Sequence, residues 1–130
     1  MKILRRVFLG VCLCFSFVLA ACSNKSNVSQ SYADKVNNSY KAGNTLTYET
    51  VKSDLNDECI DVTNDKNGVL VAIKGVPASN YQEKLDKAKD DEKFEFISIT
   101  VIKGNCTYAY YALATKTEIT SSIINSKVNN

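Results

Sequence analysis

The sequence predicts an α+β domain in which a four-stranded, mostly antiparallel sheet packs against helices on one face, in the order ααββαββα. Two long runs rich in β-branched and aromatic residues, Lys93 to Ile102 and Cys106 to Ala114, flank a short Lys-Gly-Asn segment typical of a hairpin. Two shorter β-rich runs flank Asn-Asp-Lys-Asn-Gly. The remaining segments carry apolar residues at helical spacing, and helices segregated on an antiparallel sheet define the α+β class.

Two helices are expected before the first hairpin. The first has apolar residues at every fourth position from Tyr32 to Tyr40 and a stop signal at Gly43. The second begins at Thr47, whose side chain is suited to cap it, and continues to Leu55.

The first hairpin is predicted to pair 58–63 with 69–74 around the turn-forming Asn67-Gly68. A capping box at Ser79 starts a helix that is expected to continue to about residue 90. A second capping box, formed by Thr115 with the glutamate three residues later, starts a short C-terminal helix.

Alternation along the last two strands predicts which of their residues enter the core. The expected core face consists of Ile97, Ile99, Val101, Cys106, Tyr108 and Tyr110. The opposite face is mixed, and it carries an apolar group that we interpret as a candidate interaction patch: Phe96, Tyr111 and Leu113. Apolar surface of this kind can mark a partner site.

The N-terminus has the pattern of an export signal. Three basic residues occur among the first six, and a fifteen-residue apolar run, Val7 to Ala21, is short for a membrane span, which needs about 20 residues. This run ends in Leu19-Ala20-Ala21-Cys22, which resembles the processing site of bacterial lipoproteins. The resemblance implies cleavage before Cys22 and a diacylglycerol on its thiol. The alternative is a secreted protein with a chance cysteine.

These signals divide the chain into four parts. We expect a signal peptide over 1–21, a lipidated Cys22 with a flexible polar tether over 22–31, a single domain over 32–126 and a frayed tail over 127–130. A tether of this length would hold the domain a few nanometres from the membrane.

Composition excludes several functions for the exported part. It keeps 13 of the 16 basic residues against 14 acidic ones, and it has no arginine, histidine or tryptophan. A nucleic-acid partner is not expected without a basic excess. The common general base and metal ligand is missing, and no catalytic motif is present. We therefore expect no enzyme activity, no catalytic or metal-binding residues and no cofactor besides the lipid.

Cys59 and Cys106 are the only other cysteines outside the signal segment. Disulfides persist in exported proteins, and closing this loop would stabilise the fold by about 4 kcal/mol. The alternative is two separate buried thiols that behave as small apolar residues.

The segment from Leu46 to Leu55 is similar to part of the SmpA/OmlA lipoproteins and of the β-lactamase-inhibitor-like repeats. Thr47, Val51 and Leu55 match the pattern of these families, whereas Thr45 and Asn56 replace two of its glycines. The resemblance implies a binding or scaffolding module of the cell envelope.

The sequence thus predicts a lipid-anchored protein on the extracytoplasmic side of the cell membrane, or of the outer membrane where the host has one. Its expected role is non-enzymatic binding of an envelope or protein partner. A small-ligand or ion-binding lipoprotein is the first alternative and a small hydrolase is the second.

Overall fold

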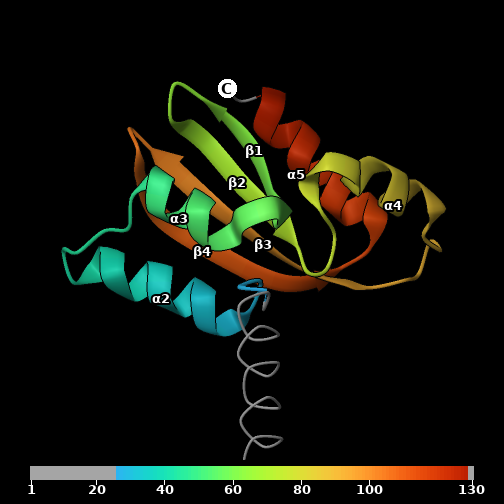
Figure 1. Cartoon of the computed structure of the whole chain (residues 1–130), viewed down its shortest axis with the longest axis horizontal. Helices are drawn as coiled ribbons and strands as arrows, with labels where there is room; N and C mark the ends of the chain where they lie inside the picture. Colours follow the sequence, from blue (N-terminus) through green and yellow to red (C-terminus); the bar gives the residue numbers. More distant parts are fainter. Residues whose placement is uncertain (1–25, 129–130) are drawn as a thin grey trace, which may run out of the picture.

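The computed structural model describes residues 26–128 and confirms the predicted α+β fold and element order (Figure 1). Its main elements are α2 (Gln30–Lys41), α3 (Tyr48–Leu55), β1 (Cys59–Asn64), β2 (Asn67–Ile73), α4 (Tyr81–Lys87), β3 (Phe94–Ile102), β4 (Asn105–Ala114) and α5 (Lys116–Val128). Two 3-10 turns, η1 (Asn56–Glu58) and η2 (Ala78–Asn80), precede β1 and α4. The four strands form an antiparallel meander in the order β1-β2-β3-β4.

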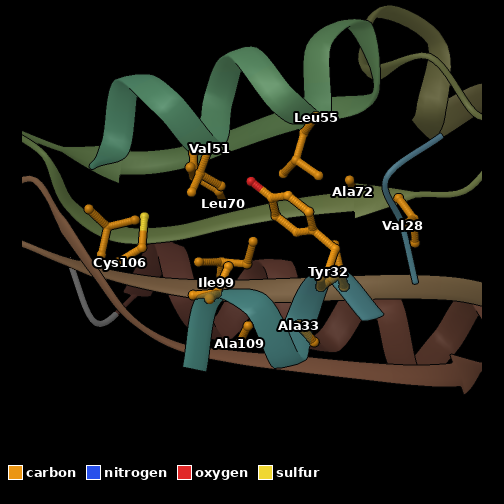
Figure 2. Close-up of a cluster of buried hydrophobic side chains, with 13 residues drawn as sticks. Val28, Tyr32, Ala33, Val51, Leu55, Leu70, Ala72, Ile99, Cys106 and Ala109 are labelled. Atoms are coloured by element: carbon orange, nitrogen blue, oxygen red, sulfur yellow. The ribbon is translucent and has the colours of Figure 1, made fainter. Parts of the chain in front are cut away.

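The helices cover both faces of the sheet, and the expectation that they lie on one face is wrong. Side chains of α2 and α3 share one buried cluster with alternate residues of the strands, including Leu70, Ile97 and Ile99 (Figure 2). Side chains of α4 and α5 share a second cluster with the intervening residues, such as Val71 and Ile73. The inner strand β2 is therefore apolar on both sides, in agreement with its uninterrupted apolar run from Val69 to Ile73.

Local signals explain where most helices start and end. Ser29 accepts a hydrogen bond from the Tyr32 amide at 3.1 Å and caps α2, and the Thr47 hydroxyl does the same for α3. The predicted capping box of α5 is confirmed: Thr115 and Glu118 bond each other's amides at 2.9 and 3.3 Å.

Three predicted boundaries shift. The turn of the first hairpin lies at Asp65 and Lys66, which both have positive φ, so the expected Asn-Gly turn belongs to β2 instead. The helix expected over 79–90 is shorter, because α4 begins without a side-chain cap and ends at Lys87. The C-terminal helix continues to Val128, so the first two residues of the expected frayed tail are helical.

The predicted tether also ends earlier than expected. Val28 is buried with 1% of its surface exposed, and Ser26 and Asn27 make side-chain hydrogen bonds to the domain. The segment that begins at Ser26 is therefore attached to the domain, and we call residues 26–31, which include the first two residues of α2, the N-terminal strap. The remaining tether residues and the signal segment, including Cys22, lie outside the described residues.

Candidate binding surface

A β-bulge in β4 decides which tyrosines face solvent. Thr100 pairs with Tyr108 but Val101 pairs with Cys106, so Thr107 is an extra residue in β4. The bulge reverses the alternation beyond it. Ala109 and Tyr111 therefore lie on the α2/α3 side of the sheet, and the expectation that Tyr108 and Tyr110 enter the core is wrong.

The two displaced tyrosines belong to an uncovered half of the α4/α5 side of the sheet. Helix α5 packs mainly on β1 and β2. The parts of β3 and β4 nearest their shared hairpin are therefore left uncovered on this side. Tyr108 and Tyr110 are 54% and 52% exposed. We call this surface the open face; cross-strand pairing and alternation give it the side chains of Ser98, Thr100, Ile102, Tyr108 and Tyr110.

The open face continues into a shallow hollow of about 460 Å³ beside the C-terminal half of α5. Thr100 and Ile102 form its sheet side, and Ser122, Asn125 and Ser126 form its helical side. The hollow is wide and open to solvent. Tyr108 and Tyr110 are more than half exposed and therefore do not enclose an internal cavity, which would have favoured the small-ligand alternative.

The chemistry of the open face suits binding. Its side chains are two aromatic rings, two hydroxyls and one aliphatic group, and none carries a charge at neutral pH. The Tyr110 ring contacts Phe96 edge to face with centroids 6.3 Å apart, which holds one ring in place. Exposed tyrosines provide a large apolar area together with a hydrogen-bonding tip, as protein interfaces do.

The sequence-predicted interaction patch does not form one surface. Phe96 is buried against α4 and α5, whereas Tyr111 and Leu113 lie on the other side of the sheet, because the bulge separates them. Tyr111 donates a 2.5 Å hydrogen bond to Glu95, which also pairs with Lys74 at 3.3 Å. This bond raises the pKa of the Tyr111 phenol and lowers that of the Glu95 carboxyl. Leu113 alone remains well exposed, at 61%.

The outer edge of β4 is capped by a side chain from α2. The amide of Asn37 donates to the Ala109 carbonyl at 3.0 Å and accepts from the Ala109 amide at 2.8 Å. It thus replaces a neighbouring strand at this position. Nearer the hairpin, the Cys106 amide donates to the Leu46 carbonyl at 2.9 Å. The first half of the β4 edge is therefore closed.

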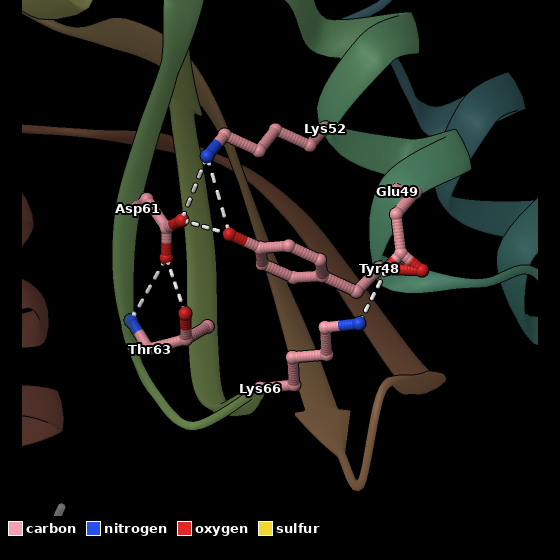
Figure 3. A network of polar contacts seen from close by, with 6 residues as sticks. All are labelled: Tyr48, Glu49, Lys52, Asp61, Thr63 and Lys66. Carbon is pink, nitrogen blue, oxygen red and sulfur yellow. Dashed lines mark hydrogen bonds and ion pairs between the residues drawn. The ribbon is translucent and has the colours of Figure 1, made fainter.

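A second polar cluster joins α3 to β1, and Figure 3 shows its arrangement. Asp61 accepts hydrogen bonds from the Tyr48 hydroxyl, from Lys52 at 3.2 Å and from the Thr63 hydroxyl and amide at 2.5 and 3.0 Å. A separate pair, Lys66 with Glu49 at 3.2 Å, lies beside it.

This cluster is built as a structural connection. Desolvation raises the pKa of Asp61, but the bonds from Thr63, Tyr48 and Lys52 outweigh it and lower the pKa below its ordinary value. The same contacts, led by the one to Tyr48, raise the pKa of Lys52. Both groups are thus held in their charged forms across the neutral range, and both oxygens of Asp61 are occupied. The arrangement fastens α3 to β1 and leaves no free base.

Both cysteines of the domain lie on the α2/α3 side, where Cys106 is buried and Cys59 is half-buried. Burial is the main cause that raises the pKa of each to about 11. Cys59 is in β1 and Cys106 is in β4, so two strands lie between them. Strands are about 4.8 Å apart, whereas bridged cysteines need Cα atoms within about 7 Å. The disulfide stays a prediction, and it would require one of the outer strands to move.

Among the described residues 26–128, no helix combines the length and the apolar character that crossing a membrane requires. The Cys, Asp and Glu side chains of the same residues form no cluster suited to a metal ion.

The sequence missed Tyr108 and Tyr110 as surface residues because alternation gives no position for a bulge. The one available signal is the Tyr110-Tyr111 pair, since adjacent bulky residues of a strand must face opposite sides. Comparisons with protein-family models, with curated proteins and with solved structures found no match. The resemblance to SmpA-like modules therefore remains an expectation from sequence.

Proposed function

We propose that this chain is a lipid-anchored extracytoplasmic protein whose domain binds an envelope or protein partner through the open face, without catalysis. The observation that carries the proposal is the exposure of Tyr108 and Tyr110 on an uncharged half-sheet next to a hollow. Its anchor is the expected lipid on Cys22, which follows the basic and apolar N-terminal segment. Two acyl chains are enough for stable membrane attachment.

Several features support binding over catalysis. The polar cluster around Asp61 is fully occupied by its own hydrogen bonds. The thiols have raised pKa values, so they are poor nucleophiles at neutral pH. The side chains of the open face include no carboxylate, imidazole or amine.

The anchor is tested by intact mass spectrometry of the protein purified from its native host. We expect a mature chain that begins at Cys22 and carries the mass of a diacylglycerol. Cys22→Ser, which cannot be acylated, is expected to release the protein from the membrane fraction. A different N-terminus or the absence of an acyl mass would contradict the anchor.

The binding role is tested by crosslinking in intact cells followed by affinity capture. The double variant Tyr108→Ser/Tyr110→Ser is expected to lose a crosslinked product that the unaltered chain forms reproducibly. Tyr40→Ser is a matched control, because Tyr40 is 50% exposed but lies on α2. Equal capture by all three chains would remove the open face as the binding site.

A further inference from the structure

The N-terminal strap is fastened to one particular end of the sheet. The Ser26 hydroxyl donates to Glu58 at 2.6 Å, and the Asn27 side chain donates to the Asp54 carbonyl at 2.8 Å. Val28 belongs to the α2/α3 cluster, and Figure 2 shows it at the opposite end of that cluster from Cys106. Three consecutive residues of the strap thus hold it in place by independent contacts.

Glu58 extends this attachment to the sheet itself. It is the buried charged side chain among the described residues, with 9% of its surface exposed. One carboxylate oxygen accepts from Ser26, and the other accepts from the Gly75 amide at 2.6 Å. Glu58 directly precedes β1 and Gly75 follows β2. The strap is therefore tied to the end of the sheet where β1 begins and β2 ends.

The meander gives the sheet two distinct ends. Both hairpin turns, at Asp65–Lys66 and Lys103–Gly104, lie at the far end, where the Gly104 amide donates to the Lys66 carbonyl at 3.0 Å. The eight steps of β3 from Phe94 to Ile102 span about 26 Å at ~3.3 Å per residue. This is the approximate separation of the strap end from the hairpin end.

The covalent chain between the anchor and the strap is short. Cys22 and Ser26 are four residues apart, so the chain between their Cα atoms spans at most about 14 Å, whatever its conformation. Charges of both signs lie at this end, with Lys35 and Lys74 near Asp54, Asp57 and Glu58, so these residues provide no cationic excess that would attract anionic lipid. The covalent link from Cys22 to Ser26 is what limits the distance between the lipid and the strap.

We propose that the strap end of the domain lies next to the lipid surface. The strap holds this end close to the membrane and directs the hairpin end away from it. This inference rests on the lipid anchor of the proposed function. It places the hollow, which is lined by Gly68 and Ile102 near the hairpins, on the side away from the membrane. The open face is then presented to a partner that approaches from outside the lipid layer.

The test uses the lipidated full chain in phosphatidylcholine vesicles that contain a lipid with a nitroxide head group as a fluorescence quencher. A fluorophore is attached at Asp57→Cys near the strap or at Lys103→Cys in the far hairpin. Both positions are exposed, whereas Cys59 and Cys106 are largely or fully buried. We expect strong quenching at position 57, little at position 103, and no effect of added salt.

Releasing the strap from the domain should reduce the difference in quenching between positions 57 and 103. The variant Ser26→Ala/Asn27→Ala/Val28→Ser removes its three attachments and extends the free link from four to seven residues, or about 25 Å. We expect quenching at position 57 to fall, while circular dichroism shows that the fold is kept. Ser31→Ala, an exposed strap position, serves as the matched control.

The outcomes separate this inference from the proposed function. Equal quenching at positions 57 and 103, in a chain whose acyl mass has been verified, overturns the orientation and leaves the anchor intact. Unchanged quenching after release of a strap that hydrogen exchange shows to be detached also overturns it. The absence of an acyl mass overturns the proposed function, and this inference with it.

Discussion

The two faces of the sheet differ in how completely helices cover them. On the α2/α3 side, residues of all four strands are covered, from Cys59 in β1 to Ala109 in β4. On the α4/α5 side, α5 covers β1 and β2 and leaves Tyr108 and Tyr110 open. The α2/α3 face is thus mostly covered, with Leu113 exposed near the end of β4, whereas the α4/α5 face leaves half of its sheet surface exposed.

The largest expected effect comes from the same residue type on opposite faces of one strand. Ile99 is fully buried on the covered face, whereas Ile102 is 50% exposed on the open face. We expect Ile99→Ala to lower the free energy of unfolding by about 2–5 kcal/mol, because it leaves a cavity. Ile102→Ala should stay within about 0.5 kcal/mol. Urea unfolding measures both, and similar values would contradict the assignment of the faces.

Thiol reactivity gives the next largest contrast. Burial raises the pKa of Cys106 from 9.0 to about 11, and two units correspond to a hundredfold lower thiolate population at neutral pH. Reaction with a maleimide should be slower by at least about this factor than for Tyr108→Cys on the open face.

The same experiment decides the disulfide that the sequence favours. Two free thiols should become fully reactive in denaturant without a reductant. A mass 2 Da below that of the reduced chain would instead establish the bridge, since disulfide formation removes two hydrogens, and would contradict the strand arrangement between Cys59 and Cys106.

The edge cap of β4 should have an intermediate effect. Asn37→Ala removes both hydrogen bonds to Ala109 and leaves a partly buried amide and carbonyl without them. We expect a loss of about 1–3 kcal/mol in the free energy of unfolding. Asn38→Ala is a matched control, because Asn38 is exposed on the same helix. Faster amide exchange at Ala109 in the Asn37 variant alone would locate the effect.

Sequence reasoning reached the fold because its signals were local. Apolar spacing, the cap at Thr47 and the capping box at Thr115 each specify a helix within a few residues. Which face of the sheet a helix covers depends on contacts between residues far apart in the chain. The apolar spacing within α5 alone does not predict that face. The helices were therefore predicted, but they were all placed on one face, whereas α4 and α5 cover the other.

The candidate binding surface shows the same limit more sharply. One extra residue at Thr107 moves every later side chain of β4 to the other face. The sequence identified the right strand and the right aromatic residues but exchanged their roles: Tyr108 was placed inside and Phe96 outside. The strap was missed for a related reason, since Ser26 and Asn27 are typical of a flexible tether until Glu58 and Asp54 supply partners.

The smallest expected effect is a change in how stability depends on pH, and it concerns one carboxylate at the edge of each face of the sheet. Asp61 connects α3 to β1 on the covered side, whereas Glu118 caps α5 on the other side. Hydrogen bonds lower the pKa of both carboxyls. At Asp61, desolvation is the largest single effect and acts in the opposite direction, but the hydrogen bonds together outweigh it. At Glu118, the hydrogen bond from the Thr115 amide is the main cause. A lowered pKa in the folded state adds stability above the ordinary pKa, and this stability is lost as the pH falls through the folded value.

We therefore expect the unaltered domain to lose stability below the ordinary values of 4.5 for glutamate and 3.8 for aspartate. Asp61→Asn should lower stability at pH 7 and flatten the loss below about pH 3.8, because its amide does not titrate there. Glu118→Gln should reduce only the loss of stability that begins as the pH falls below about 4.5. Denaturant unfolding at several pH values measures both slopes. If neither variant changes its slope, the two carboxylates do not stabilise the edges of the two faces, and acid sensitivity has its origin elsewhere in the domain.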